Sequence, residues 1–163
     1  MAGPKQRAED EEPLILGEFL PYRLSVVQEK VSALFAERYE KRFGLSIQEW
    51  RVMAVTGEVP VRSTQEVIER TAMSRVKVSR AAIRLADKGL IDRTTHPRDQ
   101  RAHMLKLTAK GRGVYRQIVP LARELQAALV NALTAEELAQ LEAILTKLDG
   151  IATELSGEGV EQE

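Results

Sequence analysis

The chain of 163 residues contains no cysteine, which excludes disulfide bonds, thiolate zinc sites and redox sensing by a thiol. Only 4% of the residues are aromatic, which argues against a protein that stacks single-stranded bases on exposed rings. No apolar run approaches the roughly 18 residues of a membrane span, and the acidic N-terminus lacks the basic flank and apolar core of a secretory signal. We therefore expect a cytoplasmic protein without membrane association.

Groups suited to catalysis are also scarce. His96 and His103 are the only histidines, and the chain has no HExxH pair, no Walker loop and no Rossmann glycine pattern. We predict that the protein is not an enzyme and needs no cofactor. A metal site built from His96, Asp99 and His103 is an alternative, but we favour the absence of a metal.

The formal net charge of zero conceals a strong asymmetry. Residues 62–116 contain 14 Lys/Arg against 5 Asp/Glu, whereas the remainder contains 10 against 19, a balance of about +9 and −9. Such an asymmetry indicates a local surface that binds a polyanion. Because the aromatic content disfavours single strands, duplex DNA is the better target.

Short-range signals predict a mainly helical chain. Capping-box spacing opens helices at Ser46, Ser63 and Thr134, each with a glutamate three residues later. Apolar spacing predicts one long helix over Leu14–Phe43, with Pro21 as a kink or an early break. We expect Gly44 to end that helix.

The segment from Ser74 to Arg101 carries the most information. Ser74 can cap a basic helix that ends before Gly89, so the short helix from Gln65 to about Arg70 and this one form a helix-turn-helix. Partial alternation on both sides of Pro97 predicts a two-stranded hairpin, which would be the only sheet. After Thr108 the chain is helical again, and its last helix has a stripe of leucine and isoleucine.

This pattern resembles the MarR family of winged helix-turn-helix transcription regulators from about residue 16 to residue 153. The residues that carry the resemblance are the capped helix with Trp50, Ser74-Arg-Val-Lys-Val-Ser-Arg80, Leu85-Ala-Asp-Lys-Gly-Leu90, Pro97-Arg-Asp-Gln-Arg101 and Leu107-Thr-Ala-Lys-Gly111. The resemblance implies a homodimer in which the N- and C-terminal helices interleave. It also implies ligand-responsive binding of duplex DNA, with repression as the usual outcome.

The implied organisation divides the chain into a helical dimerisation region and a DNA-binding lobe. Residues 14–45 and 114–155 are assigned to the dimerisation region, and residues 46–113 to a winged helix-turn-helix lobe. Residues 1–13 are predicted to be a disordered tail and residues 156–163 a frayed one. The predicted fold is therefore mainly α with a small β-hairpin wing.

The basic helix is predicted to enter the major groove, where each base pair presents a distinct pattern of donors and acceptors. We assign base or phosphate contacts to its exposed side chains, which are Ser74, Arg75, Lys77, Ser79, Arg80 and Arg84. Arg80 is the first choice for specificity, because the family pattern has an arginine there and guanidinium pairs bidentately with guanine. A twofold dimer implies a near-palindromic operator.

The wing is predicted to reach the adjacent minor groove through Arg98 or Arg101. Asp99 would be repelled by phosphate, so we expect it to pair with Arg101 and fix the tip of the wing. These side chains complete the predicted DNA-binding set. Solvated loop charges are the plainer interpretation of any one arginine taken alone.

The resemblance also implies a small-molecule effector bound between the dimerisation helices and the DNA-binding lobe. Candidate residues are Arg23, Trp50 and Arg51, because a cation beside a ring can hold the carboxylate of an aromatic ligand. The preferred ligand class is an aromatic acid or an aromatic acyl-CoA. Trp50 could equally be a core residue, and Arg23 could form an interhelical ion pair.

A helical protein-interaction module without specific DNA binding is the remaining alternative. The C-terminal leucine stripe supports it, but a dimer interface explains the same stripe and leaves the basic segment with a role.

Overall fold

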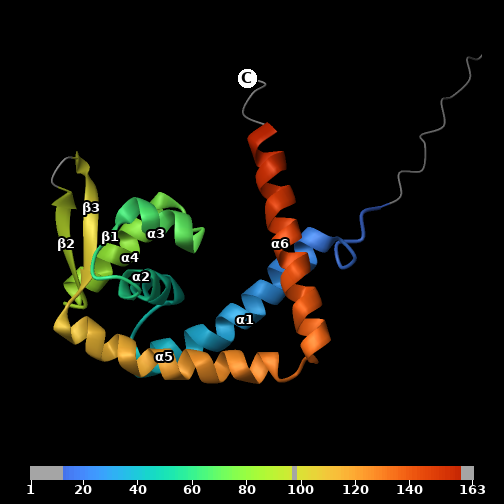
Figure 1. The fold of residues 1–163 in the computed structure, drawn as a ribbon, viewed down its shortest axis with the longest axis horizontal. Helices are drawn as coiled ribbons and strands as arrows, with labels where there is room; N and C mark the ends of the chain where they lie inside the picture. The colour runs from blue at the N-terminus through green and yellow to red at the C-terminus, as the bar shows by residue number, and fades with distance from the viewer. Residues whose placement is uncertain (1–12, 97–98, 159–163) are drawn as a thin grey trace, which may run out of the picture.

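The computed structural model describes residues 13–96 and 99–158, and for residues 96, 99–102 and 157–158 it describes the backbone alone. The described residues form six helices and one small antiparallel sheet, which confirms the predicted fold (Figure 1). The elements in chain order are α1 (Leu20–Phe43), α2 (Ile47–Gly57), β1 (Arg62–Ser63), α3 (Thr64–Thr71), α4 (Arg75–Asp87), β2 (Ile91–His96), β3 (Asp99–Leu107), α5 (Ala109–Val130) and α6 (Ala135–Glu158).

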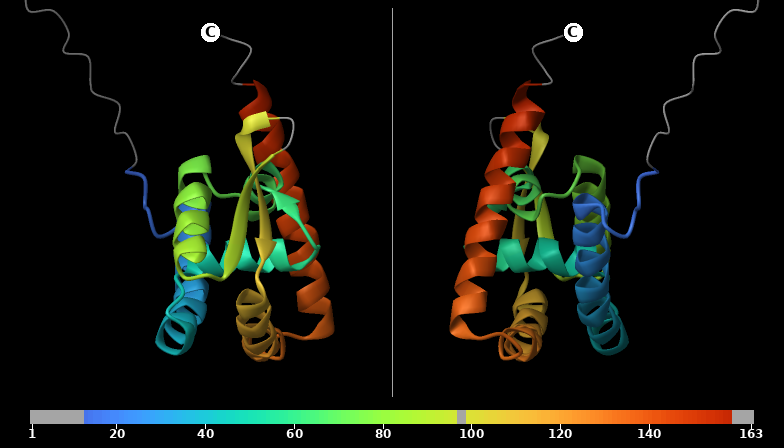
Figure 2. Two further views of the ribbon diagram at one scale, coloured as in Figure 1. Left: turned by 90° about the vertical axis from the view of Figure 1, so that its left-hand side faces the viewer. Right: turned by 90° about the vertical axis from the view of Figure 1, so that its right-hand side faces the viewer.

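A compact lobe lies at one end of the long helix α5, and α6 lies at the other. In Figure 1, α5 runs along the bottom from the sheet to α6, which stands upright on the right. The side views in Figure 2 place α1 and α6 on opposite flanks of the molecule. Two long helices therefore project from the lobe without packing closely on each other, since α6 makes at most marginal contact with the rest of the chain.

The start of the first helix differs from the prediction. We expected a helix from Leu14, but α1 begins at Leu20 and has Pro21 in its first turn. Proline favours this position because the first backbone N–H groups of a helix have no intrahelical acceptor, and its fixed φ suits helix entry. Pro21 is thus the early break, and Gly44 ends the helix in the left-handed conformation, with φ of 62°.

The predicted capping boxes are present at all three positions. The Ser46 and Ser63 hydroxyls accept from the backbone N–H groups of Glu49 and Glu66, and those glutamates accept from the serine N–H groups in return. Thr134 and Glu137 make the same reciprocal pair before α6. These helix starts are correct because a capping box needs only residues three positions apart.

The sheet has one strand more than predicted. The expected hairpin of β2 and β3 is present, but β1 pairs antiparallel with β3, placing Arg62 opposite Leu105 and Ser63 opposite Met104. The strand order in the described residues is therefore β1-β3-β2. A two-residue strand has no alternation that a sequence pattern could detect, so its pairing depends on where the tertiary fold places it.

Arg62 is a buried member of the basic segment. Its side chain is 4% exposed, donates from Nε to the Val55 carbonyl at 3.0 Å and pairs with Glu58 at 3.0 Å. Glu66 lies 3.8 Å away on α3. Arg62 thereby fastens β1 to α2 and α3, and its charge is unavailable to DNA.

The core of the protein lies inside the lobe. Its fully buried side chains come from the end of α1, from α2, α3, α4 and β3, and from α5, and the largest are Tyr39, Leu45, Met53, Leu85, Leu105 and Ile118. By contrast, the predicted stripe on α6 is largely exposed in the single chain, with Leu141, Ile144, Leu145 and Ile151 at 42–55% and Leu138 and Leu148 half-buried. Helix α6 continues to Glu158, past residue 156 where a frayed tail was predicted, and residues 159–163 lie outside the described residues.

Candidate nucleic-acid interface

Helix α4 is held in the lobe by one apolar face. Val78, Ala81, Ala82 and Leu85 are buried against the core. The side chain of Ser74 caps the helix by accepting from the backbone N–H of Lys77 at 3.4 Å. The N-terminal half of α4 is therefore fixed in place while its opposite face remains open to solvent.

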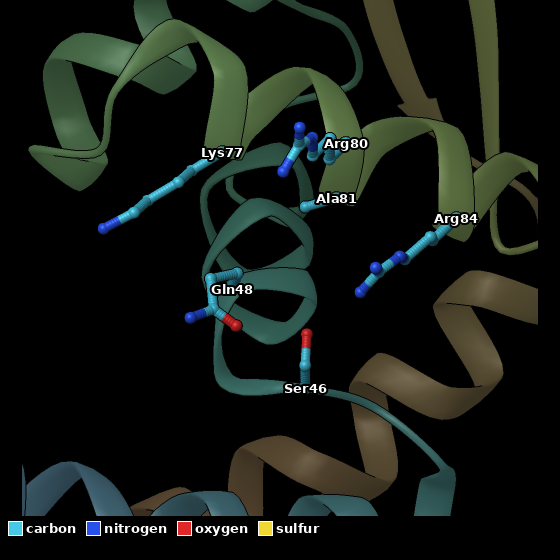
Figure 3. A pocket seen from close by; sticks show the side chains of 6 residues that line it. All are labelled: Ser46, Gln48, Lys77, Arg80, Ala81 and Arg84. Atoms are coloured by element: carbon cyan, nitrogen blue, oxygen red, sulfur yellow. The ribbon is translucent and has the colours of Figure 1, made fainter.

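Three cations on α4 line one open hollow. Lys77, Arg80 and Arg84 surround a volume of about 160 Å³ that is closed on its other side by Ser46 and Gln48 at the start of α2. Figure 3 shows the three cationic side chains projecting from α4 beside the first turn of α2. All three are exposed and form no ion pair within the part of the chain that the structure describes. Uncompensated cations around a hollow suit a phosphate or the electronegative edge of a base.

The other predicted contacts on α4 lie on its opposite flank. Arg75 is exposed and donates from Nη2 to the Oε1 atom of Gln65 on α3 at 3.1 Å. Ser79 lies one turn after Arg75 on the same side of the helix and is half-buried. The structure thus divides the predicted set into two groups, with Lys77, Arg80 and Arg84 on the flank facing α2 and Arg75 and Ser79 on the flank facing α3.

Lys88 anchors the C-terminal end of α4, a role that the sequence analysis missed. Its Nζ atom donates to the Gly44 carbonyl at 2.7 Å and to the Oε1 atom of Glu49 at 2.8 Å. Its own carbonyl accepts from Lys110 of α5 at 2.8 Å. The basic helix is therefore tied to the ends of α1, α2 and α5, and it cannot tilt without breaking these bonds.

The carboxylate of Glu49 is buried, with 2% exposure. Burial alone raises its pKa, but the Lys88 ammonium and the Ser46 N–H and hydroxyl groups outweigh burial and hold the pKa below its ordinary value. Glu49 is therefore ionised at neutral pH. It serves both as the reciprocal partner of the α2 cap and as the counter-charge for Lys88.

Several basic residues counted in the charged segment have structural partners. Arg62 is buried, Arg70 pairs with Glu58 at 3.2 Å, and Lys88 pairs with Glu49. The charge that remains to face a polyanion is concentrated on α4 and on the strands, where Arg93 and Lys106 are also exposed.

The predicted wing contacts fall outside what the structure describes. Arg98 lies beyond the described residues, and at Asp99 and Arg101 only the strand backbone is described. The hairpin itself is present beside α4, as Figures 1 and 2 show. The minor-groove role of these side chains remains a prediction, as does the alternative metal site, which needs the side chain of Asp99.

The structure separates the candidate effector residues. Trp50 is half-buried in an aromatic cluster that joins three helices, with ring centroids 5.2 Å from Tyr39 and 6.0 Å from Tyr115. Arg51 is its neighbour on α2. Arg23 lies on the exposed N-terminal half of α1, and the sixteen residue steps from Arg23 to Tyr39 span about 24 Å of helix. Arg23 and Trp50 of one chain therefore do not form a single site.

Tyr39 adds an unusual polar group to the aromatic cluster. The residue is fully buried, and its hydroxyl has no hydrogen-bond partner among the described atoms. Burial raises the pKa of Tyr39 to about 12, so the hydroxyl remains a neutral donor at physiological pH.

Within the described residues, no helix combines the length and apolar character that crossing a membrane requires.

Comparisons with known proteins identify relatives of the chain. Residues 43–102 match the model of the MarR family. A probable transcriptional regulator from Pseudomonas aeruginosa is 26% identical, and the alignment covers 82% of this chain and 98% of that one with a TM-score of 0.71. A mutant of MarR from E. coli complexed with operator DNA is also 26% identical, with 82% and 97% covered and a TM-score of 0.72.

A third structure shares the fold at lower identity. BpsR of Bordetella bronchiseptica, whose DNA binding is regulated by 6-hydroxynicotinic acid, is 21% identical, with 85% of this chain and 98% of that chain covered and a TM-score of 0.74. The matches extend over nearly the full length of each related structure. The similarity therefore includes the long helices as well as the lobe.

Proposed function

We propose that this chain, whose residues 43–102 match the model of the MarR family, is a transcriptional regulator rather than an enzyme, and that it represses its target genes as a homodimer bound to a near-palindromic operator. The observation that carries this proposal is the cationic hollow. Lys77, Arg80 and Arg84 converge there from a capped helix whose orientation Lys88 fixes. Such an arrangement suits insertion of α4 into the major groove.

Apolar surface that the single chain leaves open supports the proposed dimer. Both long outer helices carry exposed large side chains, which on α1 are Leu20, Tyr22, Leu24, Val27 and Leu34 and on α6 are Leu141, Ile144, Leu145, Ile151 and Leu155. Exposed apolar surface of this extent marks an interface, and α6 has almost no partner within its own chain. A second copy would cover both helices and place two α4 helices about 34–36 Å apart on one side of the duplex.

Selection of duplexes from a random pool would test sequence-specific binding. We expect enrichment of a near palindrome, with an affinity that falls steeply with salt because Lys and Arg release counterions from phosphates. Sedimentation of the free protein should give twice the mass of one chain. A monomer, or duplex binding without sequence preference, would instead favour a helical interaction module.

Arg80 and Arg101 should differ in their effect on the selected operator. Arg80→Ala should lose about 1–3 kcal/mol of operator binding and relax the sequence preference, because a bidentate contact to guanine distinguishes bases. Arg101→Ala should weaken operator and scrambled duplex about equally. If Arg80→Ala kept the parental ratio of operator to scrambled affinity at matched salt, Arg80 would not be the specificity residue.

We propose an aromatic carboxylate or aromatic acyl-CoA as the effector that releases the operator. The aromatic cluster of Tyr39, Trp50 and Tyr115 at the junction of α1, α2 and α5 supports a ring-binding site, and the unpartnered Tyr39 hydroxyl offers it a donor. Arg51, the neighbour of Trp50 on α2, would bind the carboxylate. BpsR, which responds to 6-hydroxynicotinic acid, provides a precedent for this ligand class.

The effector proposal has a built-in reporter, because Trp50 is the only tryptophan. Benzoate, hydroxybenzoates and benzoyl-CoA should be titrated while tryptophan emission and operator binding are followed together. A true effector changes both signals over the same concentration range, since a ligand shifts an equilibrium only by its differential affinity for the two states. Arg51→Gln should raise the concentration required. Release of DNA without a change in emission would contradict a site beside Trp50.

A further inference from the structure

The centre of the exposed face of α4 carries an apolar side chain among the cations. Val76 is 57% exposed, which is the largest exposure of any large apolar side chain in the described part of residues 46–113. The next in that lobe are Val61 at 45% and Ile83 at 43%. A valine that is more than half exposed on the first turn of a basic helix contributes little to folding, and its place among the cations puts it where α4 would contact a partner.

Helix geometry places Val76 at the tip of α4 that would enter a groove. At 100° per residue, Val76 lies almost opposite the centre of the buried face formed by Val78, Ala81, Ala82 and Leu85. Arg80 follows one turn later on nearly the same line. Lys77 and Arg84 lie to one side and line the hollow beside α2 (Figure 3). Lys77 and Arg84 therefore suit the phosphate strand at the edge of the groove, whereas Arg80, which also lines the hollow, continues the line from Val76 that faces the bases.

Only one group in the major groove is matched to an aliphatic side chain. The C5 methyl of thymine is the apolar feature among the base edges there, and small apolar side chains make contact with it. Val76 has no donor or acceptor with which to recognise any other base edge. The four-residue rise from Val76 to Arg80 is about 6 Å, close to two base-pair steps of about 3.4 Å.

We propose that Val76 is a specificity-determining residue that contacts a thymine methyl group in each half-site, about two base pairs from the guanine that Arg80 contacts. The inference rests on the proposed operator binding and adds the identity of a second base pair. In this proposal, Arg80 makes hydrogen bonds to a guanine, and Val76 makes an apolar contact with a thymine methyl group.

Replacing thymine by uracil in the operator tests the contact, because uracil lacks only the methyl group. After selection of the operator, each thymine of a half-site is replaced in turn, and affinities are measured for the parent and for Val76→Ser. Replacing the contacted thymine in one half-site should lower the operator affinity of the parent about fourfold. Replacing it in both half-sites should lower that affinity about fifteenfold. Val76→Ser should bind the thymine and uracil operators equally.

Val59→Ser serves as the matched control, because it removes another exposed valine of the lobe, 37% exposed, outside α4. It should retain the full thymine preference. Thermal unfolding of Val76→Ser should match the parent, since the replaced side chain is exposed and serine and valine have similar helix propensities.

The two proposals fail in different ways. If no duplex sequence is enriched, operator recognition itself is wrong. If an operator is enriched but the parent tolerates uracil at every position, or Val76→Ser remains as sensitive as the parent, then Val76 does not contact a thymine methyl and operator binding still stands.

Discussion

Replacing Gly111 by alanine should destabilise the protein, because a Cβ atom at this position would lie 1.9 Å from the carbonyl oxygen of Leu90. An ordinary contact needs at least about 3.4 Å, so the start of α5 and the chain after α4 must separate by more than an ångström. That carbonyl also accepts from the Thr108 N–H at 3.1 Å. Separation would therefore strain or break the bond that joins β2 to the start of α5.

The expected cost follows from these contacts. Overpacking of this kind costs about 1–3 kcal/mol, and a lost hydrogen bond adds about 0.5–1.5 kcal/mol. The gain of up to about 1 kcal/mol from alanine's better helix propensity offsets part of this. The free energy of unfolding of Gly111→Ala should therefore fall by about 1–3 kcal/mol.

Gly113 provides a matched control on the same helix. A Cβ atom there would meet nothing within 4 Å, so Gly113→Ala should raise the free energy of unfolding by about 0.5–1 kcal/mol. The melting temperatures of the two variants should differ by roughly 4–16 °C for a chain of this size. Thermal and urea unfolding should be compared at equal protein concentration, because the stability of a dimer depends on concentration. Equal stability of the two variants would refute the close approach of Gly111 to Leu90.

Three further predictions concern the lobe. Ala72 ends α3 with φ of 51°, so Ala72→Gly should raise the free energy of unfolding by about 0.5–1 kcal/mol in urea denaturation, and a loss of stability would contradict strain at this turn. The pKa of Glu49 is lower in the folded protein than its unfolded value near 4.5. The contribution of Glu49 to the free energy of unfolding is therefore complete above pH 4.5 and is lost as the pH falls through the folded pKa. Glu49→Gln should therefore lose stability at neutral pH and show a shallower acid decline than the parent, and parallel pH profiles would argue against the pairing with Lys88. Gln48→Glu places a carboxylate in the cationic hollow and should weaken operator binding at least tenfold at low salt, whereas Gln140→Glu on α6 should leave operator binding unchanged. Equal operator affinities of the two variants would exclude the hollow from the interface.

Part of the DNA-binding site could be predicted from local pattern alone. The exposed side of α4 follows from the 3.6-residue period, which placed its cations on the solvent-facing side as the structure has them. The period did not draw attention to Val76, because one apolar residue on the exposed side of a helix carries no signal of what it contacts. Lys88 was also missed, since one lysine at a helix end carries no signal of its distant acceptors.

The sequence by itself determined where most of the helices begin, although it placed the start of α1 six residues too early. Ser46, Ser63, Ser74 and Thr134 start their helices, and Gly44 and Gly89 follow helix ends with φ of 62° and 68°. These features depend on hydrogen bonds and backbone angles within about four residues, so the local sequence is sufficient to specify them.

Tertiary structure alone decided which distant groups meet. The pairing of β1 with β3, the contact of Lys88 with Glu49 across 39 residues and the approach of Gly111 to Leu90 all join segments far apart in the chain. Burial of Arg62 in the basic segment belongs to the same class. Each depends on how the apolar faces of several elements pack together, and that arrangement is a property of the whole core rather than of any local stretch of sequence.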